Sequence, residues 1–496
     1  FRIYANQDNE PADYSDTNVP YKPKKSLSIS LKGVKENDFT IVYGFPGTTQ
    51  EYLTSDAVNL ISNVENPVKV KIRDEKLRIL NEAMKSDPLV KLQYANKYQS
   101  VSNAWKKWIG ESKGVKVYDA IEKKKKLEQE FLLWQEADKS RKAKYGNLLP
   151  AFEKAYKAYS PIALAYDYFI EAGNSMDIIK YAWGFNALVN KCLDKSVSDE
   201  EIKKLSDQHA EKTKYFFKNY DVQTDKKLFI SIMQIYFNNA EIPYRPTFFS
   251  TINGKKYSGD FEKFGNDIYS KSLFTSEAGI KKSMTNFKRK NAKKILNDPI
   301  YTVAESIYSN FYNNIMPVYE SINDRLDSLY RLYITGLREM MPGKKFYPDA
   351  NSTLRLTYGK VEGYKPMDGV KYKYYTTLQG MMEKESPDVE DYKVPVKLKE
   401  LFENRDYGPY GTDSIIPIAF IASNHTSGGN SGSPVLNAEG QLVGINFDRV
   451  WEGTMSDIMY NPAQFRNISL DIRFVLFIID KYASAKWLID EMKIAN

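Results

Sequence analysis

The stretch GGNSGSPV, residues 428–435, places Ser431 among glycines and small polar residues. Glycine allows backbone angles that other residues avoid, and it lets a substrate approach the main chain closely. A serine in such a turn can project from the surface with main-chain N–H groups on either side, which is the local requirement for a nucleophile beside an oxyanion hole. Taken alone, the same composition is more typical of a Gly/Ser-rich surface loop, so the surrounding chain has to distinguish the two.

Apolar runs on both sides of this turn predict the strands that would position Ser431. Residues 415–422 precede the turn, and residues 434–437 and 441–447 follow it in a pattern typical of a hairpin. The returning strand continues into Asp448-Arg449, about eighteen residues after Ser431. Brought back beside the serine, these two side chains would present opposite charges to a substrate.

The whole chain divides into three zones of different texture. Residues 1–47 alternate in the manner of β-strands, and the texture returns to β after residue 341. Residues 48–341 are poor in glycine and carry apolar residues at spacings of three and four, which predicts helices, for example over 198–219. A long helical block between two β zones is best interpreted as an insertion into a β domain, so we expect an α+β protein.

Composition narrows the classes of function. A length of 496 residues is too great for one hydrophobic core, so two or three domains are expected. The net charge of +8 is mild at this length and does not indicate nucleic-acid binding, because the densest basic run, Lys123–Lys126, is flanked by glutamates. One cysteine and two histidines form no set with metal-ligand spacing, so neither a metal nor another cofactor is expected. No apolar run approaches the length of a membrane span, about 18 residues.

A longer motif carries a resemblance to a known family. GGNSGSPVLNAEGQLVGINFDRVWEG, followed by Ser456-Asp457-Ile458, resembles the bacterial dipeptidyl-peptidases that combine a chymotrypsin fold with an inserted helical domain. The β–helical–β order matches that family, and the stretches 102–106 (SNAWK) and 14–47 look similar as well. The resemblance covers essentially the whole chain and is densest over about 423–460.

The resemblance implies a chymotrypsin-like double β-barrel with a large inserted all-α domain. Residues 1–47 would be the end of the first barrel and the crossover, so that this barrel is incomplete in the chain. Residues 48–341 would be the inserted helical domain, and residues 342–496 the second barrel with the nucleophile and a C-terminal helix over about 484–493.

The same resemblance implies roles for five residues. Ser431 would be the nucleophile, and the N–H groups of Gly429 and Ser431 would form the oxyanion hole. Asp448 and Asn103 would hold the free α-amino group of a peptide, which measures off a dipeptide. Arg449 occupies the position that sets preference for the second residue, and arginine there implies Asp or Glu. The physics agrees, because a guanidinium binds a carboxylate with two hydrogen bonds and does not lose its proton.

The chain departs from the family in its proton-relay residues. In the family, the general-base histidine and its orienting aspartate lie upstream of the position where this chain begins. The first six residues, FRIYAN, alternate like the middle of a strand. We therefore expect that an N-terminal part of the protein is missing, and that the chain alone is nearly inactive. His425 is interpreted as a loop histidine with local hydrogen bonds rather than a substitute base, and His209 as an exposed helix residue.

The prediction is a serine dipeptidyl-peptidase that releases N-terminal dipeptides with Asp or Glu second from oligopeptides. One alternative is the same peptidase with a hydrophobic preference. Another is a non-catalytic peptide-binding fragment, because the His/Asp relay is absent. For Asp448, an ion pair with Arg449 itself stays open. The family resemblance further suggests a homodimer and a periplasmic or cell-surface location in a bacterium, with no nucleic-acid partner and no membrane span.

Overall fold

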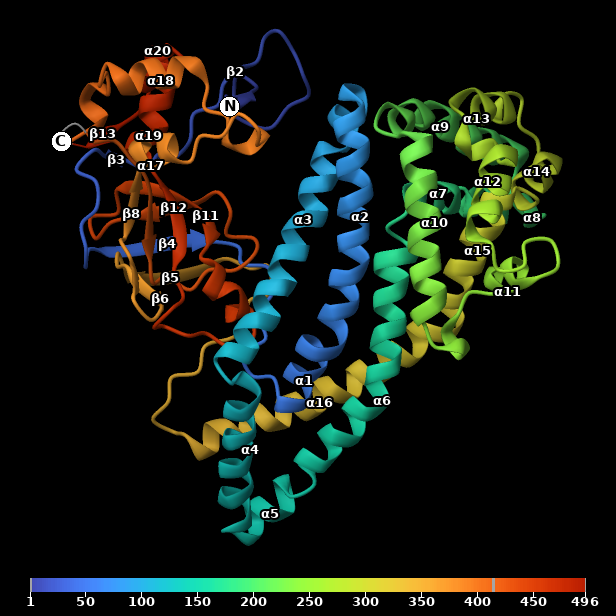
Figure 1. Ribbon diagram of the computed structural model, residues 1–496, viewed down its shortest axis with the longest axis horizontal. Helices are drawn as coiled ribbons and strands as arrows, with labels where there is room; N and C mark the ends of the chain where they lie inside the picture. Colours follow the sequence, from blue (N-terminus) through green and yellow to red (C-terminus); the bar gives the residue numbers. More distant parts are fainter. Residues whose placement is uncertain (1, 413–414, 496) are drawn as a thin grey trace. The chain divides into compact units, whose positions relative to one another are not determined.

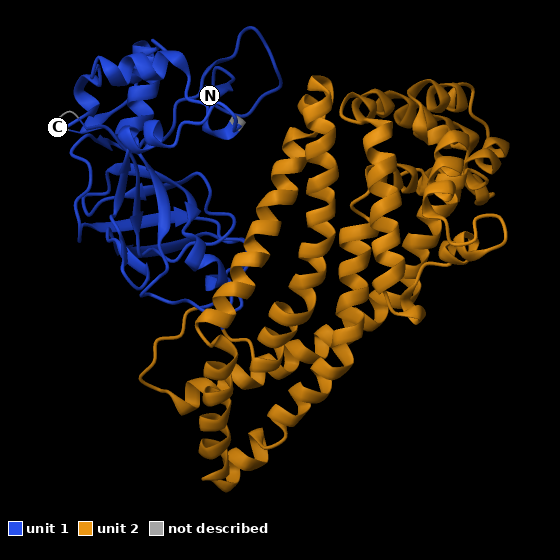
Figure 2. Ribbon diagram, in the orientation of Figure 1, with its two compact units in different colours: residues 1–51, 348–496 blue, residues 52–347 orange. Residues whose placement is uncertain are grey.

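The computed structural model describes residues 2–412 and 415–495, and it separates into two compact units (Figure 2). One unit combines residues 1–51 with residues 348–496, and the other is the continuous segment 52–347. The chain is thus mixed helix and sheet, with the helical block as an uninterrupted insertion between two parts of the β unit.

The strands lie in the β unit, and most of them form one sheet (Figure 1). Its hydrogen-bonded order is β5-β4-β10-β11-β12-β9-β8, and β3 joins it by parallel pairing with β11 and β13. The pairs β1–β2 and β6–β7 form two small separate sheets. The strands are β1 Tyr4–Ala5, β2 Val19–Pro20, β3 Ile29–Ser30, β4 Phe39–Gly44, β5 Arg355–Lys360, β6 Tyr364–Met367, β7 Val370–Tyr372, β8 Tyr375–Thr377, β9 Pro417–Ala422, β10 Ser433–Leu436, β11 Leu442–Arg449, β12 Asn467–Asp471 and β13 Ile494–Ala495.

The main sheet is antiparallel along this path and curls on itself. Val361, directly after the edge strand β5, forms an antiparallel bridge with Ala422 at the end of β9. Both residues are fully buried, together with Val42 of β4, Val435 of β10 and Val443 of β11. The apolar face of the curled sheet is therefore its inside, as the alternating pattern of the sequence requires.

The β zone before the helical block and the β zone after it contribute to the same sheet. β4 pairs with β5 on one side and with β10, the strand after Ser431, on the other. The sequence pattern correctly indicated a strand over residues 38–43, but alternation specifies the face of a strand and not its partners. Residues 1–47, expected at the end of a first barrel, thus supply a strand to the sheet that carries the turn with Ser431. Phe1 of the FRIYAN stretch lies outside the described residues.

Short helices complete the β unit, and five of them contribute buried residues to a second apolar core around Phe477 and Leu398. The C-terminal helix is shorter than expected, because it ends at Asp490 and a turn leads from it into strand β13. The helical segments are α17 Leu378–Glu383, Glu390–Tyr392, α18 Val396–Glu403, Gly408–Tyr410, Trp451–Asp457, α19 Ile472–Phe477, Ile478–Tyr482 and α20 Lys486–Asp490.

The inserted unit is all helical among its described residues, and α2 runs beside the long helix α3 (Figure 1). The helix predicted over 198–219 is confirmed as α9, which Ser198 caps by accepting a hydrogen bond from the Glu201 N–H. The helices are α1 Ser55–Leu60, α2 Asn66–Ser86, α3 Pro88–Val117, α4 Ala120–Glu136, α5 Lys139–Tyr145, α6 Leu148–Tyr168, α7 Asp177–Trp183, α8 Asn186–Leu193, α9 Asp199–Lys218, α10 Val222–Asn239, α11 Phe248–Asn253, α12 Phe261–Lys271, α13 Glu277–Met284, α14 Ala292–Leu296, α15 Pro299–Asn310 and α16 Met316–Met340.

The core of the helical unit is rich in aromatic residues, which explains part of the high tyrosine and phenylalanine content. Phe229, Phe274 and Tyr236 are almost completely buried within it. In the described part of the chain, no helix combines the length and the apolarity needed to cross a membrane.

Candidate active site

The turn that carries Ser431 lies between β9 and β10 and is held by its own hydrogen bonds. The Asn430 N–H donates to the Ser427 carbonyl at 3.1 Å, and the Ser433 N–H donates to the Asn430 carbonyl at 3.0 Å. The side-chain oxygen of Asn430 accepts from the Ser427 N–H at 3.1 Å. Asn430 is buried, whereas Ser431 is exposed, so the turn is anchored from below and presents its serine to solvent.

Glycine at position 429 is required by both the backbone angle and the available space. Gly429 has φ +104°, in the region that L side chains rarely adopt, and a Cβ there would lie 2.3 Å from the Phe45 carbonyl oxygen. The neighbouring Gly47 N–H donates to the Gly428 carbonyl at 2.6 Å, which ties the segment before the helical block to this turn. A larger residue at 429 would therefore displace the backbone of the turn.

Polar groups of the turn are available to a ligand. Within residues 2–412 and 415–495, the N–H groups of Gly429 and Ser431 donate no hydrogen bond to the protein. The Ser431 hydroxyl donates to the Phe447 carbonyl of β11 at 3.1 Å. Two unused donors beside an exposed hydroxyl are the arrangement that nucleophilic acyl transfer needs, because the donors can bind the oxyanion that develops.

A buried row of amide side chains holds the turn by hydrogen bonds, and no sequence pattern predicted it. Asn446 of β11 donates from Nδ2 to the Asn430 carbonyl at 3.1 Å, directly before Ser431. Asn467 of β12 donates in turn to Oδ1 of Asn446 at 2.9 Å, and also to the Ser469 hydroxyl at 3.2 Å. The sequence signal that could have predicted this row is the presence of polar residues at inward positions of strands that also contain apolar residues.

A bulge in β11 aims Asp448 outward. The pairing of β11 with β12 shifts register between Asn446 and Asp448, so that Phe447 and Asp448 are both exposed although they are consecutive. Oδ1 of Asp448 accepts a hydrogen bond from the Arg449 N–H at 2.8 Å. Since the Ser431 hydroxyl contacts the Phe447 carbonyl, Asp448 directly follows the residue against which the serine lies.

The guanidinium of Arg449 is paired with a carboxylate that the sequence analysis did not assign. Its Nη1 and Nη2 donate to Oδ1 and Oδ2 of Asp457 at 2.6 and 3.0 Å, and Nη1 also donates to the Ser456 hydroxyl at 3.0 Å. The side chains of Arg449 and Asp457 are only 11% and 9% exposed, so the pair is mostly removed from solvent. The ion pair considered between Arg449 and Asp448 is replaced by this pair with Asp457.

The two histidines are packed into their surroundings. His425 shares a hydrogen bond between its Nε2 and the Ser456 carbonyl at 3.0 Å, and its ring stacks on Tyr460 at 4.5 Å. Burial lowers its pKa. The interpretation of His209 as exposed is wrong, because its ring stacks on Phe185 at 4.2 Å and burial lowers its pKa too. Helical periodicity places a residue on a face but does not reveal an aromatic partner from another helix.

Asn103 lies on α3 in the helical unit and is exposed. Its side-chain oxygen accepts a hydrogen bond from Gln99 Nε2 at 3.0 Å, one turn earlier on the same helix. The side-chain oxygen of Asn103 is therefore an acceptor on an exposed helix face. Exchanging its hydrogen bond with Gln99 for one with a ligand would cost little free energy.

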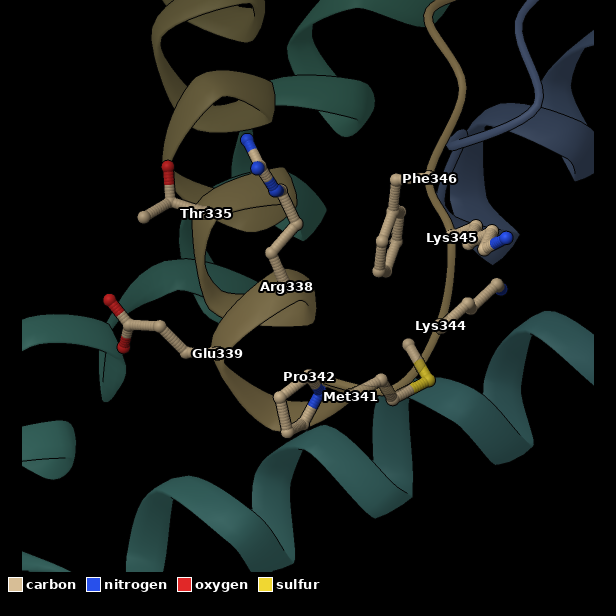
Figure 3. Close-up of a pocket in the computed structure, with 8 residues that line it drawn as sticks. All are labelled: Thr335, Arg338, Glu339, Met341, Pro342, Lys344, Lys345 and Phe346. Atoms are coloured by element: carbon tan, nitrogen blue, oxygen red, sulfur yellow. The ribbon is translucent and has the colours of Figure 1, made fainter.

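Other features of the described residues do not indicate a competing centre. No group of three metal-ligating side chains occurs in the part of the chain that the structure describes. A pocket of about 800 Å³ at the end of α16 is lined by eight residues, among them Arg338 and Phe346 (Figure 3). The Lys344 ammonium lies 5.2 Å from the Phe346 ring, and Glu339 pairs with Lys144 at 2.8 Å. None of the predicted site residues lines this pocket.

Comparison with known proteins places the chain among peptidases. The family model described as Peptidase S46 matches residues 1–494. An Asp/Glu-specific dipeptidyl-peptidase of Flavobacterium psychrophilum is 42% identical over 497 residues, covering 100% of this chain and 68% of the relative. A dipeptidyl-peptidase 7 of Phocaeicola vulgatus is 37% identical over 507 residues, with the same coverage of both chains.

The fold comparison agrees with the sequence comparison. The crystal structure of DPP11 from Porphyromonas endodontalis in complex with the dipeptide Arg-Glu matches with a TM-score of 0.87 and 33% identity. The match covers 100% of this chain and 70% of that chain.

Proposed function

The chain belongs to the peptidase S46 family, and from this premise we propose that it acts as a serine dipeptidyl-peptidase, which releases dipeptides with Asp or Glu second from the free N-terminus of oligopeptides. The observation that carries the proposal is the hydrogen bond from the Ser431 hydroxyl to the Phe447 carbonyl. It fixes an exposed nucleophile against the strand that continues directly into Asp448 and Arg449.

In this proposal the reaction proceeds by acyl transfer to Ser431. Its Oγ attacks the carbonyl carbon of the second residue, the N–H groups of Gly429 and Ser431 bind the oxyanion, and the shortened peptide leaves with the proton. Water then hydrolyses the ester and frees the dipeptide. Each oxyanion donor lowers the barrier by about 3 kcal/mol.

Selection of the dipeptide rests on charges at its two ends. The Asp448 carboxylate is exposed and suits the ammonium of the substrate, and we assign the Asn103 side-chain oxygen as a second acceptor for that ammonium. Arg449 suits the side-chain carboxylate of the second residue. A hydrogen bond to a charged group contributes about 1.5–3 kcal/mol, roughly a ten- to hundredfold preference.

We also propose that the curled sheet is the second barrel of a chymotrypsin-like pair, with the general-base histidine and its aspartate supplied by chain outside these residues. Two observations support this. The bridge between Val361 and Ala422 nearly closes the sheet. His425 Nε2 is hydrogen-bonded to the Ser456 carbonyl.

The test is hydrolysis of two dipeptidyl reporters, one of the Leu-Asp and one of the Leu-Leu type, by the full-length protein. We expect the Leu-Asp reporter to be preferred by tenfold or more in kcat/KM, and Ser431→Ala to abolish turnover. Arg449→Gly should remove the preference. Retention of acidic selectivity in Arg449→Gly would contradict the Arg449 assignment, and a wild-type protein that binds these dipeptides without cleaving either reporter would indicate a binding module.

A hydrophobic preference is the second candidate, and one observation favours it. The ion pair with Asp457 balances the positive charge of Arg449 in this structure. If that balance persisted with substrate bound, the Leu-Leu reporter would be the better substrate, so the same two reporters separate the candidates.

A further inference from the structure

Arg449 holds a carboxylate with the same two nitrogens that a substrate side chain would use. Asp457 accepts from both Nη1 and Nη2, which is the two-pronged arrangement in which guanidinium groups recognise carboxylates. The pair is only about a tenth exposed. A buried guanidinium without a counter-ion is strongly destabilising, so Asp457 stabilises the pocket when no substrate is bound.

The main chain at Asp457 is held by contacts other than the ion pair. Its carbonyl accepts a hydrogen bond from the Gln50 N–H at 2.6 Å, and the preceding residue, Ser456, is held through its carbonyl by His425 Nε2 at 3.0 Å. The main chain on both sides of Asp457 is thus anchored. The backbone therefore keeps Asp457 within reach of Arg449.

We propose that Asp457 is a resident counter-ion that competes with the acidic side chain of the substrate for Arg449, and thereby limits how tightly acidic dipeptides bind; this rests on the proposed function. Arg449 makes the site selective for a carboxylate, and Asp457 limits the affinity of the site for acidic dipeptides, so that they can dissociate.

Charge arithmetic at the site gives the direction of the effect. Asp448 and Asp457 carry one negative charge each, and Arg449 carries one positive charge, so the three together carry −1. The substrate ammonium can compensate Asp448, but the substrate carboxylate then meets an arginine that is already balanced. Removing the Asp457 charge makes the site more positive by one unit, so acidic ligands bind more tightly.

The kinetic consequence separates this role from simple support of the arginine. The substrate and the dipeptide product carry the same acidic side chain, so loss of the Asp457 charge lets Arg449 stabilise both of them more strongly, together with the transition state. Such uniform binding lowers KM without raising kcat, and tighter product slows its release. Loss of a residue that only orients Arg449 would instead weaken acidic ligands.

The experiment measures dipeptide affinity in the full-length protein with Ser431→Ala, so that no turnover occurs. The probes are Leu-Asp and its uncharged counterpart Leu-Asn, titrated by calorimetry. Asp457→Asn should tighten Leu-Asp by at least tenfold, about 1.4 kcal/mol, while Leu-Asn changes by less than twofold. Ser456→Ala is the matched control, because it removes one hydrogen bond to Nη1 and keeps the Asp457 charge.

Turnover in the protein with Ser431 intact gives the second readout. Asp457→Asn should lower KM for the Leu-Asp reporter and leave kcat unchanged or reduced, whereas Ser456→Ala should not lower KM. Asp457→Ser provides the same comparison if the asparagine variant does not fold.

Each outcome has a defined meaning. Tightening confined to Leu-Asp in the neutral variants supports the proposal. Weaker or unchanged Leu-Asp binding in those variants overturns it and makes Asp457 a support for Arg449 only. If the wild-type protein hydrolyses neither reporter, the proposed function itself is contradicted. If the enzyme is active but its Asp457 variants do not bind Leu-Asp more tightly, only the role of Asp457 is contradicted.

Discussion

Replacing Gly429 with alanine is the most direct perturbation of the proposed oxyanion hole. The added Cβ would lie 2.3 Å from the Phe45 carbonyl oxygen and 2.8 Å from the Gly47 nitrogen. Both are backbone atoms, so neither can rotate away as a flexible side chain could. The turn itself must move, and with it the unused N–H groups of residues 429 and 431.

Two neighbouring glycines separate the contributions to this effect. Gly432 has φ +84° but open space around its Cβ position, whereas Gly428 has open space and no unusual φ. Gly432→Ala thus carries only the cost of a left-handed conformation, about 1–2 kcal/mol of stability. Gly428→Ala carries neither cost and is the control for an alanine substitution in the same turn.

The assay is kcat/KM on the Leu-Asp reporter together with urea unfolding, for all three variants of the full-length protein. We expect Gly428→Ala to match the wild type, and Gly432→Ala to lose about 1–2 kcal/mol of stability with activity within tenfold. Gly429→Ala should lose at least about a hundredfold in kcat, the effect of one misplaced oxyanion donor. If Gly429→Ala instead retained activity within threefold of the wild type, the assignment of this N–H to the oxyanion would be refuted.

Three further predictions test other parts of the structure. Asn446→Ala should lower the unfolding free energy by about 2–5 kcal/mol in urea titrations and reduce kcat, because the buried Asn430 carbonyl and Asn467 amide each lose a partner; an unchanged midpoint would contradict this. His425→Phe should keep kcat within about fivefold, since the ring packs on Tyr460. Because burial lowers the folded pKa of His425, its stabilising contribution is present above the unfolded pKa near 6.5 and is lost as the pH falls through the folded pKa, so the variant should lose less stability than the wild type between pH 7 and pH 5. Burial raises the pKa of Asp225 to about 7, so its contribution is present below an unfolded pKa near 3.8 and is lost as the pH rises toward 7. Asp225→Asn should therefore be stabilising at pH 8 and nearly neutral at pH 4 in thermal unfolding, and equal effects at both pH values would speak against a buried carboxylate.

Local patterns in the sequence were sufficient for the turn and for most of the helical block. The glycines at 428, 429 and 432 indicated special backbone angles, and two of these three have positive φ. The apolar spacing of 198–219 predicted α9 within one residue at each end. These features depend on neighbours in sequence, which is why a single chain reveals them.

Features that depend on distant residues were not predicted in the same way. The alternation over 38–43 indicated a strand, but not that β4 would lie between β5 and β10. The buried row from Asn430 through Asn446 to Asn467 joins three elements, and no periodicity within one element reports it. The family motif identified the serine, whereas its support required the sheet register.

Arg449 shows how the same limit affects chemistry as well as fold. Its position in the motif predicted a positively charged cup, yet a guanidinium that is only 11% exposed requires a compensating charge. The carboxylate that supplies it, Asp457, lies eight residues downstream in a segment that was noted only as part of the resemblance. A mostly buried arginine that is assigned to carboxylate recognition therefore implies an acidic partner as well, and in our proposal this partner decides whether an acidic product is retained or released.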